Sequence, residues 1–212
     1  MARGLFLSLD GLDGTGKSTQ CRMLAEWLRS QGQTVVTCAD PGGTAVGDEL
    51  RQLLLHKRQQ MTAACEMFLF MASRAQLVAE VICPALEAGQ VVICDRFLLA
   101  NVVYQGYAGG LDPDEIWQVG RLSTGGLEPD LTLLLDLSPE QARARRSGPA
   151  DRIEGRGPVY HARVRQGFLA EAERRPERIR VINADRSPSA VQEAIRREVE
   201  PLLVPHGSNQ LV

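Results

Sequence analysis

The sequence predicts an α/β fold in three layers: a five-stranded parallel sheet with helices on both faces and a small basic lid. Five short apolar segments alternate with longer segments of helical periodicity, which is the order that such folds require. The apolar segments carry little charge, as strands covered on both faces do. A length of 212 residues suits one domain, and no change in composition marks a second.

The order of the elements follows from periodicity and from the residues that begin helices. The expected strands lie at 5–9, 34–38, 91–94, 130–136 and 179–182. The helix after the first strand carries one apolar face, formed by Cys21, Leu24, Ala25 and Leu28. Further helices are expected at 46–57, 62–88, 112–123 and 158–174, and two more begin at Pro139 and at Pro188, capped by Ser187. Pro84 should kink the long helix or begin a new one, because proline removes a backbone hydrogen bond.

The strongest chemical signal lies near the N-terminus. Residues 11–18 match G-x-x-x-x-G-K-[ST], the pattern of phosphate-binding loops, or P-loops. The pattern also arises by chance in glycine-rich turns, but a strand before it and an amphipathic helix after it favour the functional interpretation. This arrangement points backbone N–H groups and the positive end of a helix dipole at a polyphosphate. The residues expected to bind it are Gly11, Leu12, Asp13, Gly14, Thr15, Gly16, Lys17, Ser18 and Thr19.

Within this loop the residue types predict separate roles. Gly14 and Gly16 let the backbone approach phosphate oxygens without a Cβ in the way. Lys17 is expected to be a surface cation that contacts the β- and γ-phosphates, and the Ser18 hydroxyl would ligate Mg²⁺.

Two loops follow expected strands and should lie at the sheet edge where open α/β folds bind ligands. Asp95 and Arg96 come directly after the strand at 91–94, so Asp95 is a candidate for a second magnesium contact. The alternative is a surface ion pair between these two residues, which would contribute little to stability. The loop at 40–44 follows the second strand, and its sequence fits a ligand contact and a structural turn equally well.

The most basic stretch holds Arg143, Arg145, Arg146, Arg152 and Arg156, interrupted by Ser147-Gly148-Pro149. Such a run is often a solvated helix end. The glycine and proline suit a hinge, so we interpret residues at about 143–156 as a lid whose guanidinium groups neutralise phosphoryl oxygens during transfer. Residues 1–204 would then form the single domain, and 205–212 a flexible polar tail.

Composition favours a cytoplasmic protein. The net charge of −2 gives no reason to expect nucleic acid or an anionic membrane as a partner. The apolar run at 1–9 is too short for a signal peptide, and no long uncharged stretch is expected to span a bilayer. The five cysteines are scattered without a CxxC pair, which favours buried, reduced thiols over disulfides or zinc ligands.

Taken in order, the motifs resemble those of bacterial thymidylate kinases, members of the P-loop nucleoside monophosphate kinase family. The resemblance covers nearly the whole chain. It rests on the segments 13–20, 40–44, 95–97, 104–106, 129–133 and 151–154, together with Phe70 and Arg74. The P-loop alone is unspecific, whereas the full series in this order and spacing is highly specific.

The resemblance implies transfer of a phosphoryl group from ATP, with Mg²⁺, to thymidine 5′-monophosphate in the biosynthesis of dTTP. It also implies a homodimer, for which the helices at 62–88 and 112–123 are candidate surfaces. The implied substrate-binding residues are Asp13, Arg51, Phe70, Arg74, Arg96, Asn101, Tyr104 and Gln105. The implied catalytic residues are Lys17, Asp95, Arg96, Arg146 and Arg152.

In this family Phe70 would stack on thymine, Arg74, Asn101 and Gln105 would contact the base, and Tyr104 would crowd the 2′ position of the sugar. Asp13 would hold the 3′-hydroxyl region or the metal shell, while Arg51 and Arg96 would grip the acceptor phosphate. This P-loop has no arginine between Asp13 and Gly16, and such members place the basic residues in the lid. The chain departs from the common pattern at Ala39, Asp40, Ala100 and Gly109, near the acceptor pocket.

Two alternatives remain open from the sequence. Another nucleoside monophosphate or deoxynucleoside kinase of the same fold would share the P-loop and differ in the base contacts. A nucleotide-dependent switch is the second alternative, but the Asn-Lys-x-Asp signature of guanine-binding switches does not occur in the chain.

Overall fold

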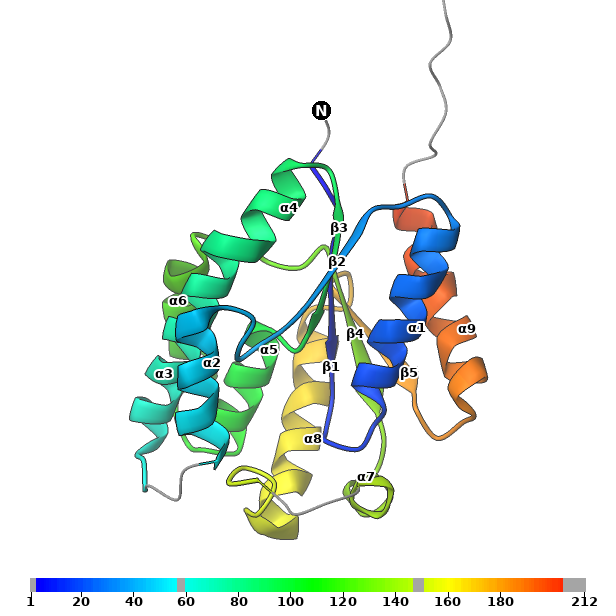
Figure 1. Cartoon of the computed structure of the whole chain (residues 1–212). Coiled ribbons are helices and arrows are strands. Elements are labelled where there is room, and N and C mark those ends of the chain that lie inside the picture. Colours follow the sequence, from blue (N-terminus) through cyan, green and yellow to red (C-terminus); the bar gives the residue numbers. More distant parts are fainter. Residues whose placement is uncertain (1–2, 57–59, 147–150, 204–212) are drawn as a thin grey trace, which may run out of the picture.

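The structure, a computed structural model, describes residues 3–56, 60–146 and 151–203. Its centre is one parallel sheet of the strands β1 (Phe6–Asp10), β2 (Val35–Ala39), β3 (Val91–Asp95), β4 (Leu131–Asp136) and β5 (Ile179–Asn183). Their order in the sheet is β2-β3-β1-β4-β5 (Figure 1). The predicted five-stranded parallel sheet is therefore confirmed, with every expected strand within about a residue of its observed bounds.

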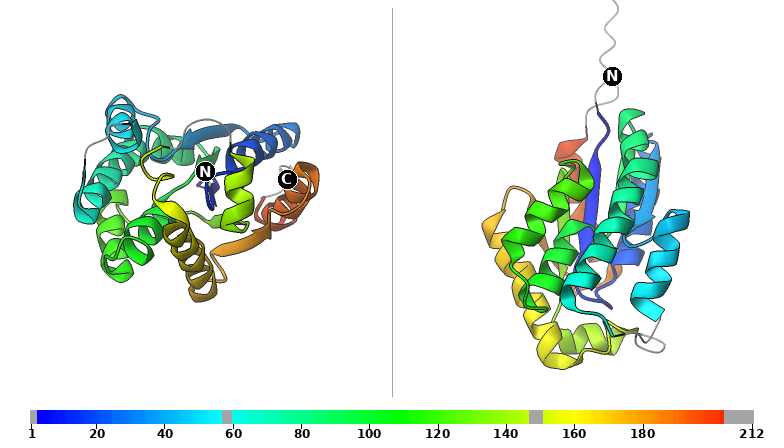
Figure 2. Two further views of the ribbon diagram at one scale, coloured as in Figure 1. Left: turned by 90° about the horizontal axis from the view of Figure 1, so that it is seen from below. Right: turned by 90° about the vertical axis from the view of Figure 1, so that its left-hand side faces the viewer.

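Helices cover both faces of this sheet. On one face lie α1 (Lys17–Ser30) and α9 (Pro188–Val199), which contact each other and the strands. On the other face α4 (Cys83–Glu87) contacts β3, and α8 (Gly157–Arg174) contacts β4 and β5. The remaining helices are α2 (Ala45–Arg51), α3 (Ala63–Leu77), α5 (Leu98–Asn101), α6 (Pro113–Thr124) and α7 (Pro139–Arg145). The views of Figure 2 show α3 and α6 side by side, and α3 continues toward α4 as one helical run.

The helices begin where the sequence provides caps. The side-chain oxygens of Thr62, Ser138 and Ser187 each accept a hydrogen bond from the backbone N–H three residues on. Pro139 and Pro188 occupy first-turn positions, where the absent N–H costs nothing. The predicted cap at Ser187 is confirmed.

The long helix expected at 62–88 is divided. After α3, the segment Val78–Ile82 widens into a π-helical turn, and α4 then begins with Pro84 in its first turn. Pro84 thus begins a new segment, because its ring and absent N–H do not fit a continuous α-helical ladder. The helix expected at 46–57 likewise ends in a π-helical segment, Gln52–His56, and another, Val102–Tyr107, follows α5.

The helical run Ala63–Glu87 is long and apolar enough to cross a membrane by length and composition, with a mean hydropathy of 1.4. The sequence predicts no long uncharged stretch that could span a bilayer. This run passes the hydropathy test because the average includes its few charged residues. A single such helix is a weak indication, since core helices of soluble proteins pass the same test. Here the run packs on the sheet face and against α6.

The described segments carry all five cysteines, and none of them forms a disulfide. Cys21 and Cys94 are buried as expected, whereas Cys65 is exposed. Of the predicted lid, residues 147–150 lie outside the described residues, and so does the predicted tail at 205–212.

Candidate active site

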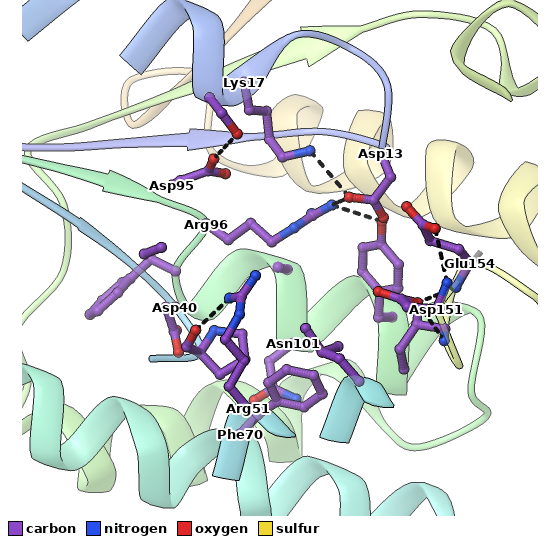
Figure 3. Close-up of a pocket in the computed structure, with 18 of the residues that line it drawn as sticks. Asp13, Lys17, Asp40, Arg51, Phe70, Asp95, Arg96, Asn101, Asp151 and Glu154 are labelled. Carbon is purple, nitrogen blue, oxygen red and sulfur yellow. Dashed lines mark hydrogen bonds and ion pairs between the residues drawn. The ribbon is translucent and has the colours of Figure 1, made fainter. Parts of the chain in front are cut away.

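One cavity of about 540 Å³ lies at the carboxyl edge of β1, β2 and β3. It is lined by the P-loop, the loops after β2 and β3, and side chains from α3, α5 and the segment 151–154 (Figure 3). This is the edge where open parallel sheets bind their ligands. The fold therefore brings the sequence-predicted loops to one place.

The P-loop connects β1 to the N-terminus of α1. Gly14 has φ 93° and Gly16 φ 96°, left-handed conformations that side chains with a Cβ rarely adopt. At Gly14 a Cβ would also lie 2.0 Å from the carbonyl oxygen of Ala142 in α7. Glycine at position 14 is therefore required by both the backbone conformation and the close approach of α7.

Lys17 is not the surface cation that the sequence suggested. Only 6% of the residue is exposed, and its Nζ donates to the carbonyl oxygens of Gly11 at 3.2 Å and Leu12 at 2.9 Å. The side chain folds back over its own loop, which is why it is buried while still lining the cavity. Burial lowers the pKa of Lys17, and the nearby Arg96 lowers it further.

Ser18 and Asp95 meet at the base of the cavity. The Ser18 hydroxyl donates to Asp95 Oδ2 at 2.7 Å, and the register of β1 with β3 places Asp95 beside Leu9. A hydroxyl and a carboxylate at this position suit Mg²⁺, which takes few protein ligands and completes its shell with water and phosphate oxygens. The described residues contain no group of three or more His, Cys, Asp or Glu side chains that could hold a metal.

Arg96 lies at the centre of the site. Its φ of 69° is left-handed, and no other residue except glycine adopts positive φ in the described part of the chain. Such backbone strain persists only where surrounding contacts fix it, and it is concentrated at functional sites. The guanidinium donates to Gly11 O at 2.8 Å, to Asp13 Oδ1 at 2.7 Å and to the Tyr104 hydroxyl at 3.3 Å. Arg96 thus links the P-loop to the other side of the cavity (Figure 3).

Two carboxyl groups beside Arg96 and Lys17 have pKa values that shift in opposite directions. Burial would raise the pKa of Asp13, but the charges of Arg96 and Lys17 outweigh it and hold that pKa well below its usual range. Asp10, at the end of β1, is fully buried, and neither of its oxygens has a hydrogen-bond partner in the structure. Burial raises the pKa of Asp10 to about 7, against the opposing effect of Arg96 and Lys17. Asp10 was not singled out from the sequence, although a charged residue directly after an apolar strand was the available signal.

The opposite wall of the cavity holds the predicted base contacts. Phe70 from α3 lines it, as do Tyr104 and Arg51, whose guanidinium donates to Pro41 O at 2.6 Å. Arg74 is 1% exposed and forms a buried ion pair of 2.6 Å with Asp40. A short hydrogen-bonded series follows: Arg74 donates to Asn101 Oδ1 at 3.0 Å, and Asn101 Nδ2 donates to Gln105 Oε1 at 2.7 Å. All eight sequence-predicted substrate residues line this one cavity: Asp13, Arg51, Phe70, Arg74, Arg96, Asn101, Tyr104 and Gln105.

The predicted catalytic arginines of the lid separate into two groups. Arg146 lines the cavity and lies 3.5 Å from Glu154. Arg152 does not line it: its Nε donates to Leu54 O at 2.7 Å, and Nη2 forms an ion pair of 2.5 Å with the buried Glu66. Glu66 was not singled out from the sequence, whereas Glu154 belongs to the segment 151–154 of the resemblance but was given no role. For Glu66 the signal was a charged residue on the apolar face of a helix.

A P-loop alone would indicate only nucleotide binding. Here the same cavity continues into a second half that offers an aromatic ring and several guanidinium groups, which defines a P-loop phosphotransferase with two substrates. A family model described as thymidylate kinase matches residues 9–195, so the chain belongs to the thymidylate kinase family. The resemblance found in the sequence is thereby confirmed.

Individual relatives agree with the family model. The chain is 46% identical over 201 residues to a thymidylate kinase of Symbiobacterium thermophilum, covering 94% of both chains. It is 48% identical over 192 residues to a thymidylate kinase of Rhodopirellula baltica, covering 91% of this chain and 78% of that one. Among solved structures, a thymidylate kinase from Ehrlichia chaffeensis superposes with a TM-score of 0.79 at 30% identity, over 93% of this chain and 99% of that chain.

Proposed function

We propose that the chain catalyses the transfer of the γ-phosphoryl group of ATP to thymidine 5′-monophosphate, giving the diphosphate from which dTTP is made. Membership of the thymidylate kinase family supports the reaction class. The observation that carries the assignment of sites is that one cavity joins the P-loop to Phe70 and Arg74. ATP would place its phosphates on residues 11–19, and the acceptor would enter from the Phe70 side.

The chemistry requires alignment rather than a strong base. The acceptor is a phosphate oxygen that is largely deprotonated near pH 7, unlike the hydroxyl acceptor of many kinases. The enzyme must bring two mutually repelling anions into line and neutralise the charge on the phosphoryl group in flight. Lys17, Arg96 and Arg146 line the cavity and supply that positive charge. The hydrogen bonds of Arg96 to Gly11 and Asp13 would hold its guanidinium between the two phosphates.

The acceptor half would recognise the nucleoside. Phe70 would stack on the thymine ring, while Arg74, Asn101 and Gln105 would hydrogen-bond its edge. Arg74 can be positioned accurately because Asp40 and Asn101 hold two of its nitrogens. Tyr104 would exclude a 2′-hydroxyl, Arg51 and Arg96 would bind the acceptor phosphate, and Asp13 would face the 3′-hydroxyl.

Mg²⁺ would be held by Ser18 and Asp95 and would supply positive charge against the phosphoryl group that is transferred. The hydrogen bond between these two side chains supports the assignment, since both already face the same point. The hydroxyl and the carboxylate are oxygen ligands of the kind that Mg²⁺ prefers.

We further propose that the protein is a cytoplasmic homodimer with one catalytic domain. Phe68 on α3 is 57% exposed and Leu122 on α6 is 84% exposed, and these two helices contact each other. Large apolar side chains on adjoining helices form a surface that a second copy could bury. The unpaired cysteines are consistent with a reducing compartment.

Steady-state assays with ATP and the monophosphates of thymidine, uridine, cytidine and guanosine test the function. Thymidine monophosphate is expected to have the largest kcat/KM. A larger value for another monophosphate would replace the substrate assignment by that of a different nucleotide kinase. Hydrolysis of ATP without transfer to any acceptor would instead favour a nucleotide switch.

A further inference from the structure

Glu66, in the first turn of α3, is a carboxylate buried completely beside the cavity but outside its lining. Its two oxygens serve different parts of the molecule. Oε1 accepts a hydrogen bond of 2.6 Å from Gln105 Nε2. Oε2 lies 2.5 Å from a guanidinium nitrogen of Arg152 and 2.5 Å from one of Arg156. One side chain therefore joins the proposed base contacts to the basic segment at 151–156.

On the base side, Glu66 determines the direction of a hydrogen-bonded series. Arg74 can only donate and an ionised Glu66 can only accept, so the two amides between them have one consistent orientation. Asn101 turns its oxygen to Arg74, and Gln105 turns its nitrogen to Glu66. The middle bond, from Asn101 Nδ2 to Gln105 Oε1 at 2.7 Å, completes the series. Glu66 thus decides which amide groups remain available to a base.

On the lid side, Glu66 holds two arginines that also bond elsewhere. Arg152 donates its Nε to Leu54 O at 2.7 Å, and its backbone N–H donates to Leu55 O. Arg156 donates to the Tyr160 hydroxyl at 2.9 Å, and that hydroxyl donates to the backbone oxygen of Tyr104. These contacts fix both ends of the segment that carries Glu154, the ion-pair partner of Arg146.

We propose that Glu66 is a positioning residue that sets the orientation of Gln105 and Asn101 toward the base and at the same time holds the 151–156 segment in place. It touches neither substrate and acts through these partners. The inference rests on the proposed function, because it assigns Gln105 and Asn101 to the recognition of thymine. It also gives Arg152 a role in holding the lid segment rather than in contacting the phosphoryl group.

The variant Glu66→Gln is expected to disturb the contact with Gln105 more than the contacts with Arg152 and Arg156. A carboxylate offers two acceptor oxygens, whereas an amide of the same shape offers one. The charged guanidinium groups of Arg152 and Arg156 attract that single oxygen more strongly than the neutral Gln105 Nε2 does, because interactions with charged groups are the stronger ones. The amide nitrogen would then face Gln105 Nε2, and this donor-to-donor contact would force Gln105 to rotate. Base selectivity should therefore change although no residue in contact with the base has been replaced.

The measurement is the ratio of kcat/KM for thymidine monophosphate to that for cytidine monophosphate. The two bases differ at position 4, a carbonyl in thymine and an amino group in cytosine, so they require opposite hydrogen-bonding partners. In Glu66→Gln the ratio is expected to fall about tenfold, the effect of one mispaired hydrogen bond. The kcat for thymidine monophosphate should also fall, because an uncharged amide oxygen holds Arg152 and Arg156, and through them the segment that carries Glu154, more weakly than a carboxylate does.

Glu171→Gln is the matched control. Glu171 is also completely buried and accepts from Tyr107, Trp117 and Arg174 at 2.8–3.0 Å, but it does not line the cavity. Its replacement should lower Tm by a similar amount and leave the selectivity ratio unchanged. If Glu66→Gln lowers Tm as the control does and leaves both kcat and the ratio at wild-type values, the role of Glu66 is structural only and the proposal is overturned.

Glu66→Asp keeps the experiment decisive if the glutamine variant does not fold. Aspartate retains two acceptor oxygens, so the direction of the series and the selectivity ratio should be kept. The shorter side chain cannot reach Gln105 and both arginines, so kcat should fall. A folded aspartate variant with unchanged kcat, or with a ratio about tenfold below that of the wild type, would contradict the proposal. A wild-type enzyme without preference for thymidine monophosphate would overturn the proposed function instead.

Discussion

The two halves of the cavity are built in different ways. The donor half is local: the groups that would hold ATP phosphates lie within residues 11–19, and the backbone would supply most of them. The acceptor half is assembled from α3, α5 and the loops after β2 and β3, and side chains supply its contacts. The difference teaches that changes in the donor half should act on phosphoryl transfer, while changes in the acceptor half should act on substrate choice.

Lys17→Ala tests the donor half most severely. Removing the cation that would neutralise the transferring phosphoryl group should lower kcat by about 10³-fold, in the range seen for loss of a preorganised electrostatic contact. The KM for thymidine monophosphate should change little, because Lys17 lies on the P-loop side of the cavity. Steady-state kinetics measure both constants, and circular dichroism checks that the fold is retained.

Lys17→Met is the matched control for packing. Because Lys17 is buried, alanine also removes apolar contacts of its side-chain stem, whereas methionine keeps them. Equal losses of kcat in the two variants would attribute the effect to the charge. Near-normal turnover in either variant would contradict the proposed role of Lys17 in the transition state.

Arg146→Ala compared with Arg152→Ala sharpens the boundary between the halves. Arg146 lines the cavity, so its loss should lower kcat by about 10²-fold and affect the KM for thymidine monophosphate less. Arg152 is turned toward Glu66 and Leu54, so its loss should lower kcat by a smaller factor. The kinetic constants of the two single variants and the double variant make the comparison.

The double variant identifies how Arg152 acts. If Arg152 works only by holding the segment that positions Arg146, the combined effect should be less than the product of the single effects. A larger loss of kcat in Arg152→Ala than in Arg146→Ala would place Arg152 on the phosphoryl group, as the sequence alone suggested. A rise in KM without loss of kcat would place either arginine in ground-state binding.

The contrast between a site formed by one local segment and a site assembled from distant segments also explains how much could be predicted from the sequence. Strand positions and the P-loop depend on local patterns of burial, periodicity and backbone freedom, and these are visible in a single chain. Glu66 and Asp10 gain their meaning from neighbours that lie far away in sequence, such as Arg152 and Arg96. The burial of Lys17 depends on how its side chain folds over the loop carbonyls, which the motif does not specify. Arg152 was grouped with Arg146 by spacing, although only the fold shows that they face different partners.

Asp10 and Asp13 provide the smallest and most specific comparison, because they lie three residues apart and their pKa values shift in opposite directions. Burial raises the pKa of Asp10 from its usual value near 4 to about 7, so the folded protein retains a proton there that the unfolded chain releases. The stability contributed by that proton is present below about pH 4 and is lost as the pH rises to about 7. The pKa of Asp13 is lowered, so its contribution is present above pH 4 and is lost only as the pH falls.

We therefore expect Asp10→Asn to be more stable relative to the wild type at pH 8 than at pH 5. Asparagine carries no charge to desolvate at either pH, whereas the wild type must ionise a buried carboxyl group as the pH rises. The change in relative stability should be of the order of 2–4 kcal/mol, since each unit of pKa shift corresponds to about 1.4 kcal/mol. Thermal unfolding followed at several pH values measures it as a Tm difference that grows from pH 5 to pH 8.

Asp13→Asn, measured in parallel, should be less stable than the wild type at both pH values, because it loses the ion pair with Arg96. A Tm difference for Asp10→Asn that does not vary with pH would show that Asp10 is already ionised at pH 5, held by Lys17 and Arg96 as firmly as Asp13 is.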